Sequence, residues 1–363
     1  MVPANRDHDS PRRGQATNDA APRITVLIPT YRRPELLARA LSSVLEQDGP
    51  RRKVCVFDNC SMDDTAGVVN GFARRFPDVH YHCQPENIGS LRNFEFALRS
   101  VTSEYFSLLS DDDYLLPGFF QRSLGGLQMT PDAAFWAGAT LMVDSSATIV
   151  DARVLRWPES GRFDPPEGAI AMTGGMAPIW TGILFRSHVL QTLGLPRFEL
   201  GGPSDLDFVL RIAASRPVVV EKVPVAVFTL NESSYSATEP LSSFWPGWRT
   251  MIARFREDSA LPGAGRRRLA ELLDRDAERM LFRRGINALA HGRVAFASEA
   301  AGHLRTQYGS RGKAALVQAM VAGCRFIPGT QALLRVAYRL AERRIIRSRK
   351  DLTQDYLSLL RRP

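Results

Sequence analysis

The chain has 363 residues, which is enough for a catalytic domain of roughly 200 to 250 residues and an extension. Its composition, 44% hydrophobic and 23% charged, is typical of a water-soluble globular protein, and no stretch reaches the roughly 18 apolar residues of a transmembrane helix. The four cysteines show no metal-ligand spacing, which favours reduced thiols in a cytoplasmic protein over a disulfide framework or a zinc site.

The two ends of the chain differ from its middle in composition. Residues 1–22 are rich in Pro, Asp, Arg and Asn, lack the apolar segment of a signal peptide, and predict a disordered leader. The net charge of +9 is concentrated near the other end, because residues 246–363 hold 24 basic and 10 acidic residues. This asymmetry predicts a basic C-terminal region whose partners differ from those of the preceding part.

Alternating strand and helix signals follow the leader. Each predicted strand is a short β-branched or apolar run, and each predicted helix repeats apolar residues at helical spacing. Strands are predicted at 23–31, 53–59, 79–84 and 104–110, and helices at 34–47, 63–76 and 90–101. This order predicts an α/β fold, a doubly wound and mostly parallel mixed sheet with helices on both faces.

The pattern becomes less regular after Pro117. Further strands are predicted at 133–144, 182–187 and 220–230, a helix at 204–215, and Arg-rich helices from about Phe244 onwards. Breaks between those last helices are expected at 262–265, 309–312 and 328–329, where Pro and Gly gather. We therefore expect a globular domain at 23–243 and a basic helical extension at 244–363.

Polar residues stand where three of the predicted parallel strands end. They are Pro29, Thr30 and Tyr31 after the first strand, Asp58 and Asn59 after the second, and Asp111, Asp112 and Asp113 after the fourth. In sheets of this kind ligands bind outside the carboxyl ends of the strands, so these residues should converge on one cleft. The GxGxxG fingerprint is absent after the first strand, which counts against a dehydrogenase.

The acidic triplet, residues 111–113, has two interpretations. It is either a solvated turn before a helix or a site for a hard cation such as Mg²⁺ or Mn²⁺, which often binds one or two carboxylates together with substrate phosphates. The position at the ligand-binding edge favours the cation site. A metal ion there would neutralise charge on a leaving diphosphate.

Other polar residues near this edge also allow two interpretations. Asp58 and Asn59 form either an Asx turn or a contact to a base or ribose, and Arg92 is either solvated or paired with a phosphate or with Asp58. Asn87 and Gly89 supply a turn just before the predicted helix that carries Arg92, and a helix start of this kind also suits phosphate oxygens.

Asp205 is the candidate general base. It lies in the first turn of the helix predicted at 204–215, where a carboxylate also has a purely structural explanation. A carboxylate across the cleft from a bound donor is able to take the proton of an attacking hydroxyl. The six histidines form no metal-spacing pair, and no GxSxG elbow indicates a serine nucleophile.

Five motifs in matching order resemble glycosyltransferase family 2. They are VLIPTYRRPELLARALSSVLEQ, VFDNCSMDDT, ENIGSLRN, SLLSDDDYLLPG, and GILFRSHVLQTLG followed by GGPSDLDFVLRIA, and the resemblance covers about residues 23–236. It implies a GT-A fold in a catalytic domain at 23–243. The nucleotide-binding half would be 23–120 and the acceptor-binding half 121–243.

The resemblance also implies roles for individual residues. Residues 29–31, Asp58 and Arg92 would bind the nucleotide, residues 111–113 would form the DxD-type site for a divalent cation and the sugar nucleotide, and Asp205 would be the catalytic base of an inverting displacement. The implied metal ligands are Asp111, Asp113 and Asn231. Three positions depart from the family pattern: Ser204 replaces the acid before the base, Ser110 replaces another Asp, and Asn231 replaces a His near the diphosphate.

Residues 331–350 place four arginines, Arg335, Arg339, Arg343 and Arg347, on one stripe of a predicted helix beside an apolar stripe. This helix is predicted either to pack on the catalytic domain or a second subunit, or to lie on an anionic membrane surface as a peripheral anchor at the inner face of the membrane. Nucleic acid is not expected as a partner, since no recognised binding module accompanies the charge.

The favoured function is therefore a metal-dependent glycosyltransferase of cell-envelope polysaccharide or glycoconjugate synthesis. UDP-, dTDP- and GDP-linked donors all fit, and the acceptor is expected to be a carbohydrate or lipid-linked molecule. The alternatives are a catalytically inactive domain that binds a nucleotide or carbohydrate as a scaffold, and a nucleotidyltransferase. The latter is disfavoured because IPTYRRPE has no glycine for a phosphate loop.

Overall fold

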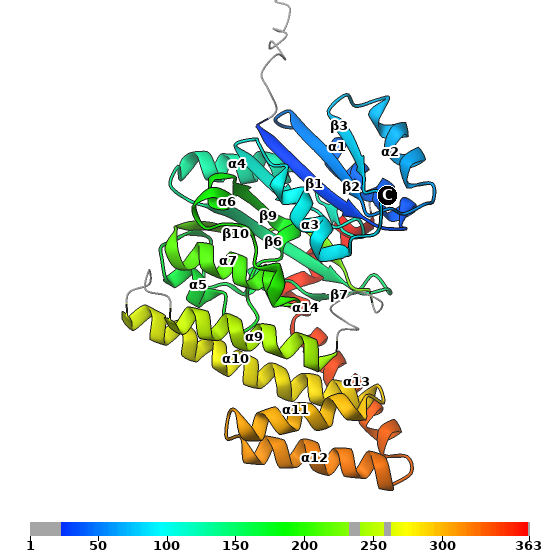
Figure 1. Ribbon diagram of the computed structural model, residues 1–363, viewed down its shortest axis with the longest axis vertical. Helices are drawn as coiled ribbons and strands as arrows, with labels where there is room; N and C mark the ends of the chain where they lie inside the picture. The colour runs from blue at the N-terminus through cyan, green and yellow to red at the C-terminus, as the bar shows by residue number, and fades with distance from the viewer. Residues whose placement is uncertain (1–22, 232–239, 258–262, 362–363) are drawn as a thin grey trace, which may run out of the picture.

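The computed structural model describes residues 23–231, 240–257 and 263–361, so the predicted leader lies outside the described residues. A ten-stranded sheet is the centre of the fold, in the order β3-β2-β1-β4-β9-β6-β10-β5, with β7 on β6 and β8 on β10 (Figure 1). The strands are β1 (Ile24–Thr30), β2 (Arg52–Asp58), β3 (Val79–Cys83), β4 (Tyr105–Leu108), β5 (Tyr114–Leu115), β6 (Phe135–Val143), β7 (Ile149–Asp151), β8 (Gly161–Phe163), β9 (Ile183–Arg186) and β10 (Val218–Thr229).

The main strands of this sheet are parallel. β1 pairs in parallel with β2 and β4, β2 pairs with β3, and β6 pairs with β10. β9 runs antiparallel between β4 and β6, so β4 and β6 point the same way. The carboxyl ends of β1, β2, β4, β6 and β10 therefore meet at one edge, and the predicted mostly parallel mixed sheet is confirmed.

Helices cover both faces of the sheet, as the strand and helix order predicted (Figure 1). β1 is buried along its whole length, and its side chains alternate between two apolar clusters: Val26 and Ile28 pack with α1, α2 and α4, whereas Leu27 packs with α3 and α7. The helices around the sheet are α1 (Pro34–Leu45), α2 (Thr65–Ala73), α3 (Ser90–Arg99), α4 (Phe119–Met129), α5 (Glu167–Ala171), α6 (His188–Thr192) and α7 (Ser204–Ser215), with single turns η1 (Arg153–Arg156), η2 (Trp180–Gly182) and η3 (Phe198–Leu200).

Helix α4 was not expected from the sequence. It contains two adjacent glycines, which lower helix propensity, and it forms because Phe119, Phe120 and Leu127 are completely buried against the sheet. One of the glycines is required by packing, since a Cβ at Gly126 would stand 2.4 Å from a ring atom of Trp136. Tertiary contacts therefore override the local preference here.

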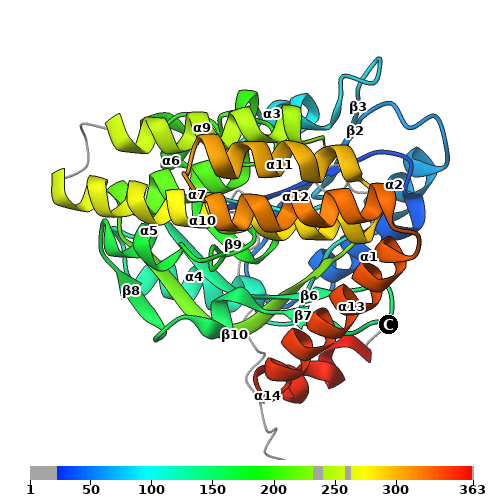
Figure 2. The same cartoon turned by 90° about the horizontal axis from the view of Figure 1, so that it is seen from below.

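A layer of longer helices follows the sheet, at the lower end of the molecule in Figure 1 and across the front in Figure 2: α9 (Leu241–Glu257), α10 (Gly263–Ala290), α11 (Val294–Thr306) and α12 (Arg311–Phe326). Helix α13 (Thr330–Ser348) then leads back towards the sheet, followed by the short α14 (Lys350–Thr353) and η4 (Gln354–Arg361). The expected helical extension is confirmed, and one further break, at Gly292 in the left-handed conformation (φ 78°), separates α10 from α11. The apolar cluster that includes Leu27 continues through α9 and α10 to Val317 of α12. None of the helices in the described ranges has the length and hydropathy needed to span a bilayer.

Candidate active site

The predicted site residues lie at the carboxyl edge of the sheet. Thr30 and Asp58 are aligned as register partners at the ends of β1 and β2. Leu108, the last residue of β4, lies beside Leu27 of β1, so the turn that holds residues 111–113 emerges next to Thr30. The structure therefore brings the three predicted strand ends together.

Asp111 anchors its turn to the end of β1. It is buried, and its carboxylate accepts hydrogen bonds from Thr30 Oγ1 at 2.8 Å, from the Tyr31 backbone N–H at 3.3 Å and from Arg33 Nη1 at 3.2 Å. Burial raises the pKa of the Asp111 carboxyl, while the Thr30 hydrogen bond and the Arg33 charge act in the opposite direction.

Asp113 lies inside the protein. Its side chain has no exposed surface, Thr181 Oγ1 donates to Oδ2 at 2.6 Å, and the Thr229 backbone N–H donates to Oδ1 at 2.9 Å. Burial raises the pKa of this carboxyl to about 8. Both oxygens already have protein donors, which argues against the predicted role of Asp113 as a metal ligand. We assign it the role of joining η2 to the end of β10.

Asp112 and Asp111 share one cation, Arg33. Nη1 of Arg33 lies 2.8 Å from Asp112 Oδ2 and 3.2 Å from Asp111 Oδ1. Arg33 is held at this place because it directly precedes Pro34, the first residue of α1. The sequence analysis did not single out Arg33, although its position between a strand end and a helix start was visible there.

The carboxylates of Asp111 and Asp112 are arranged in a way that suits a divalent cation. One oxygen from each of two carboxylates converges on a single positively charged atom, and Mg²⁺ is usually bound by one or two carboxylates with substrate phosphates. No group of three or more His, Cys, Asp or Glu residues that could hold a metal occurs in the part of the chain that the structure describes. The donor set therefore fits an ion that shares its coordination with a diphosphate and takes the place of the guanidinium.

Asp58 holds the loop that follows β2. It is buried, and it accepts hydrogen bonds from the Ser61 backbone N–H at 3.0 Å, from Ser61 Oγ and from Tyr81 OH at 2.6 Å. Burial and the Asp58 carboxylate raise the pKa of Tyr81. In this arrangement Asp58 positions the loop and leaves little of its carboxylate for a base or ribose.

The loops after β1 and β2 carry unusual backbone conformations. Arg32, Cys60 and Met62 all have positive φ, at 57°, 63° and 58°. The loops are joined because the Arg32 backbone N–H donates to Ser61 Oγ at 2.8 Å and Arg32 Nε donates to the Ser61 carbonyl at 3.2 Å. Non-glycine residues in this region of φ are strained and concentrate at ligand-binding sites, which marks these loops as a candidate nucleoside site.

Asn59, Asn87 and Gly89 are joined by hydrogen bonds beside the start of α3. Asn59 Nδ2 donates to Asn87 Oδ1 at 2.8 Å, Asn59 Oδ1 accepts the Ile88 backbone N–H, and Asn87 Oδ1 also accepts the Gly89 backbone N–H at 2.9 Å. Gly89 adopts the left-handed conformation with φ 84°. These hydrogen bonds fix the start of α3. The side chain of Arg92, on the first turn of that helix, is exposed.

Asp205 is exposed on the first turn of α7, in contrast to its neighbours. Ser204 is buried and donates to the Gly201 carbonyl, and Asp207 is fully buried beside Arg211, with Oδ2 2.9 Å from Nε. Desolvation by surrounding protein raises the pKa of the Asp205 carboxyl even though the residue keeps solvent-exposed surface. The exposed surface matters most for function, because it lets a substrate hydroxyl reach this carboxylate.

Two consecutive residues of η2 join Asp205 to the acidic turn. Trp180 Nε1 donates to the Asp205 backbone carbonyl at 3.2 Å, and Thr181 makes the bond to Asp113. Because Trp180 and Thr181 are adjacent in the chain, η2 links the start of α7 to the acidic turn. The sequence alone did not predict this connection.

The remaining predicted ligand, Asn231, lies two residues beyond Thr229 at the end of β10. The Thr229 backbone N–H binds Asp113, so Asn231 is near the acidic turn. Most of the NESSYS stretch, predicted to lie near the diphosphate, falls in residues 232–239 outside the described residues.

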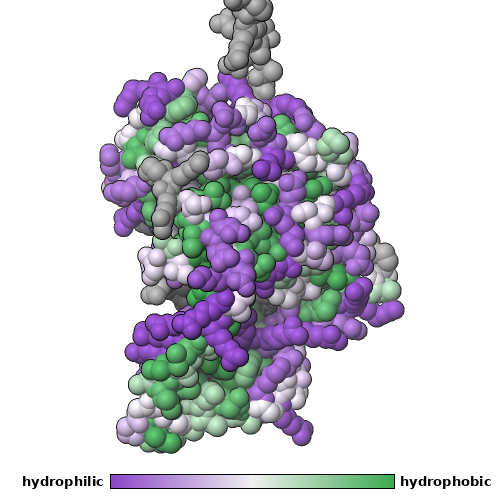
Figure 3. All heavy atoms as spheres, turned by 180° about the vertical axis from the view of Figure 1, so that it is seen from behind, coloured by the Kyte–Doolittle hydropathy of each residue, from purple (hydrophilic) through white to green (hydrophobic). Residues whose placement is uncertain are grey.

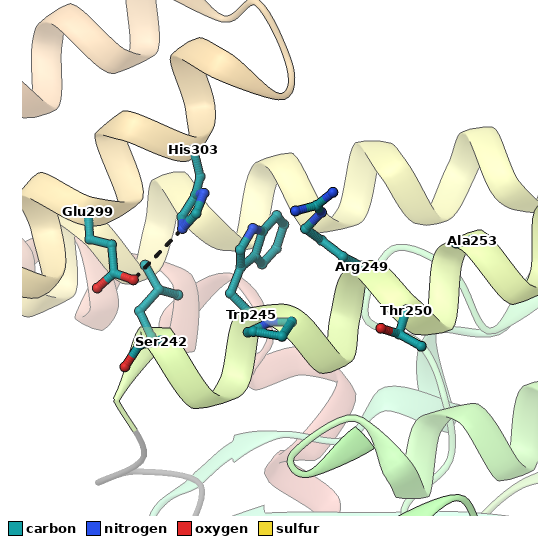
Figure 4. A pocket seen from close by; sticks show the side chains of 9 residues that line it. Ser242, Trp245, Arg249, Thr250, Ala253, Glu299 and His303 are labelled. Carbon is teal, nitrogen blue, oxygen red and sulfur yellow. Dashed lines mark ion pairs between the residues drawn. The ribbon is translucent and has the colours of Figure 1, made fainter. Parts of the chain in front are cut away.

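A separate cavity of about 550 Å³ lies between α9 and α11 (Figure 4). Trp245, Arg249 and His303 line it, and Glu299 lies 3.8 Å from His303. Trp245 is 2% exposed and donates to Gln307, so it is a packed core residue. The cavity lies away from the strand ends and has no connection to the acidic turn among its lining residues.

Part of the chain is similar to known glycosyltransferases. Residues 25–183 match the family model for glycosyl transferase family 2. A GalNAc(5)-diNAcBac-PP-undecaprenol beta-1,3-glucosyltransferase of Campylobacter jejuni is 33% identical over 98 residues, which are 27% of this chain and 32% of that protein. The matched segments span about a third of the length of the first curated relatives.

Two solved structures show the same fold. S. aureus TarS 1–349 in complex with UDP-GlcNAc has a TM-score of 0.60 at 15% identity and covers 88% of this chain and 92% of that chain. The mannosyltransferase PcManGT from Pyrobaculum calidifontis, in complex with GDP-Man and Mn²⁺, has a TM-score of 0.54 at 19% identity and covers 94% and 87%. These likenesses confirm the predicted GT-A fold.

Proposed function

We propose that the chain is a glycosyltransferase of family 2, whose model matches residues 25–183, and that it transfers a sugar from a nucleoside diphosphate donor to an acceptor hydroxyl, with inversion at the anomeric carbon. One observation carries the proposal. Trp180 and Thr181 of η2 bind the Asp205 backbone and Asp113, and so link the helix start that carries an exposed carboxylate to the turn whose other two carboxylates suit a diphosphate-bound cation.

In the proposed reaction the acceptor oxygen forms a bond to the anomeric carbon while the bond from that carbon to the diphosphate oxygen breaks. The nucleoside diphosphate leaves with the bonding electron pair, and the Asp205 carboxylate takes the hydroxyl proton. A single displacement of this kind inverts the configuration. The raised pKa of the Asp205 carboxyl suits the role, because a base is most effective when its pKa approaches the working pH.

The donor would lie across the carboxyl edge of the sheet. We assign the nucleoside to the loops of residues 29–32 and 58–62, and the diphosphate to the space between Arg92 and the pair Asp111 and Asp112. A Mn²⁺ or Mg²⁺ ion held by Asp111 and Asp112 would supply positive charge to the leaving diphosphate. Asn231 remains a candidate for contact with the same diphosphate.

The acceptor is proposed to be a lipid-linked or polysaccharide intermediate of the cell envelope. A relative's name specifies an undecaprenyl diphosphate-linked acceptor, and the two structural neighbours carry UDP-GlcNAc and GDP-Man. Free thiols at all four cysteines support work in a reducing compartment, on the cytoplasmic side of the membrane. Trp180, which is partly exposed beside Asp205, is the proposed platform for an acceptor sugar ring.

The substitution Asp205→Asn tests the assignment of the base. We expect turnover to fall by about 10²- to 10⁴-fold, the usual contribution of a general base, while the dissociation constant of the donor changes less than about two-fold. Turnover is measured by release of nucleoside diphosphate in the presence of acceptor, and donor binding by calorimetry. Glu199→Gln, at an exposed carboxylate in η3 just before α7, is the matched control and should keep its turnover.

The result also separates the enzyme from a scaffold. If the wild-type protein binds a donor but releases no nucleoside diphosphate with any acceptor, and Asp205→Asn behaves identically, the protein is an inactive nucleotide-binding domain. If Asp205→Asn retains full turnover in an active preparation, another residue is the base.

A further inference from the structure

Helix α13 exposes an apolar stripe to solvent. The helix has no buried residue, and Leu333, Val336 and Leu340 are 69%, 55% and 59% exposed. Their spacing of three and four residues places them on one face of the helix. The opposite side is attached to the protein, because Arg335 Nε donates to the Ala290 carbonyl at the end of α10 and the ring of Tyr338 packs edge-on against His291.

The stripe continues into the turn before the helix. Phe326 and Ile327, at the end of α12, are 81% and 63% exposed. Together with Leu333, Val336 and Leu340 they form what we call the α13 surface. Apolar residues also gather at the lower end of the molecule in the view from behind, below a band of hydrophilic residues (Figure 3). An apolar patch of this kind, bordered by polar residues, marks an interaction site.

The same face becomes cationic towards the end of the helix. Arg343, Arg344 and Arg347 follow Leu340 by three, four and seven residues, and all three are exposed. In the described part of the chain none of them takes part in an ion pair. We include these three arginines in the α13 surface, which is therefore apolar at its start and strongly basic at its end.

This arrangement distinguishes between possible partners. Two copies of α13 packed against each other would bury these arginines opposite apolar residues, and the helix offers only one acid, Glu342, to neutralise them. An anionic lipid surface satisfies both ends of the stripe, because acyl chains accept the apolar side chains and phosphates pair with the arginines. The charge pattern thus favours a membrane over a second copy.

The end of α13 is tied to the edge of the sheet that carries the candidate active site. Arg349 Nη1 lies 2.9 Å from Asp151 of β7, and β7 pairs with the carboxyl end of β6 (Figure 2). β6 is parallel to β10, whose last residue, Thr229, binds Asp113. A lipid surface in contact with the end of α13 would therefore lie near the edge where the donor is proposed to bind.

We propose that the α13 surface docks the protein on an anionic lipid membrane, with Phe326, Ile327 and the apolar stripe in the outer acyl layer and Arg343, Arg344 and Arg347 among the lipid phosphates. The docking goes beyond the proposed transferase activity, since it needs neither donor nor acceptor. It places the site at the membrane, where a lipid-linked acceptor presents its sugar.

Co-sedimentation of the full chain with vesicles tests the proposal. The protein should bind vesicles of phosphatidylglycerol and phosphatidylethanolamine, and bind phosphatidylcholine vesicles much less. The triple variant Arg343→Gln, Arg344→Gln, Arg347→Gln should lower the partition coefficient by about 100-fold, because each basic residue at an anionic surface contributes a factor of roughly five. A second variant, Leu333→Ser with Leu340→Ser, should also weaken binding, while both keep the wild-type circular dichroism spectrum.

A matched control removes the same charge from the far half of the protein. Arg74 and Arg75, directly after α2, and Arg122 of α4 are exposed, and their replacement by Gln should change the partition coefficient less than about two-fold. Equal loss in the control, or binding that is unchanged in both α13 variants, overturns the proposal. So does a dimer in sedimentation velocity that the α13 variants dissociate while no vesicle binds. Because the measurement contains no donor, a failure of the transferase assignment leaves its outcome unchanged.

Discussion

Acidic side chains at the carboxyl edge of the sheet are buried, whereas arginine side chains near the end of helix α13 are exposed to solvent. Asp58, Asp111 and Asp113 are all at most 6% exposed, and each accepts at least two hydrogen bonds from residues elsewhere in the chain. Arg343, Arg344 and Arg347 are exposed, and α13 contributes no buried residue. The first region uses charge to fix the geometry of a small-molecule site, and the second presents charge to a large external surface.

The difference explains which charges should be sensitive to substitution. A buried carboxylate cannot lose its partners without leaving polar groups unsatisfied, so its replacement changes stability or ligand geometry. A single exposed arginine contributes little to folding.

Within the acidic turn the largest effect is expected at Asp112. Asp112→Asn removes the less constrained of the two carboxylates that converge on Arg33, so donor affinity in the presence of Mn²⁺ should fall by about ten-fold or more. Calorimetry with and without Mn²⁺ measures the change. Asp144→Asn, in the turn between β6 and β7 and outside the acidic turn, is the control. An equal loss of affinity in the absence of metal would show that Asp112 acts on the nucleotide without an ion.

Arg33 should compete with the cation. Arg33→Gln removes the guanidinium that bridges Asp111 and Asp112, so the affinity for Mn²⁺ in the absence of nucleotide should rise several-fold, by about 1 kcal/mol or less of binding free energy. Electron paramagnetic resonance of free Mn²⁺ measures this affinity. Arg39→Gln, which removes a neighbouring cation that donates to the Asp112 backbone carbonyl, is the control. Lower Mn²⁺ affinity in Arg33→Gln would mean that the two carboxylates need Arg33 to stay in place.

A smaller, pH-dependent effect is expected at Asp113. Its pKa of about 8 in the folded protein exceeds the ordinary value of 3.8, so folding takes up a proton and this group lowers the stability as the pH rises from about 4 to 8. Asn does not titrate. The melting temperature of Asp113→Asn relative to wild type should therefore increase by a few degrees, about 2–6 °C, between pH 5 and pH 8.5.

Thermal unfolding followed by circular dichroism measures the two melting temperatures. The control is Asp164→Asn, at an exposed carboxylate paired with Arg162 in a surface turn. A difference that is independent of pH would show that Asp113 is ionised in the folded protein and fully compensated. Loss of Mn²⁺ binding in Asp113→Asn would return this residue to the set of metal ligands.

Much of the fold could be predicted because local periodicity and chain topology act together. The first four strands and three helices each carry their own apolar pattern, and the right-handed order of such units leaves few arrangements of the sheet. The strands β5, β7 and β8 were missed, since they have two or three residues each and form only against partners in the sheet. Helix α4 was missed because its two glycines lower the local helix propensity, while burial against the sheet stabilises the helix.

The site could be predicted in position but not in detail. Strand ends identified Thr30, Asp58 and the acidic turn, since parallel strands must end at one edge. The burial of Asp113 depends on Thr181, 68 residues later in the chain, and the pairing of Asp111 depends on Arg33, 78 residues earlier. No local sequence pattern indicates such distant contacts, so the different contacts of the three aspartates in the acidic turn could be learned only from the structure.

The measurement that tests the central claim most directly is calorimetry of the protein with UDP, dTDP and GDP, each with and without Mn²⁺. If the carboxyl edge of the sheet is a donor site, one of these nucleotides should bind with an affinity that depends on the metal and that Asp112→Asn lowers by about ten-fold or more. If no nucleotide binds under any of these conditions, the strand-end carboxylates are not a nucleotide-sugar site and the assignment of function falls with them.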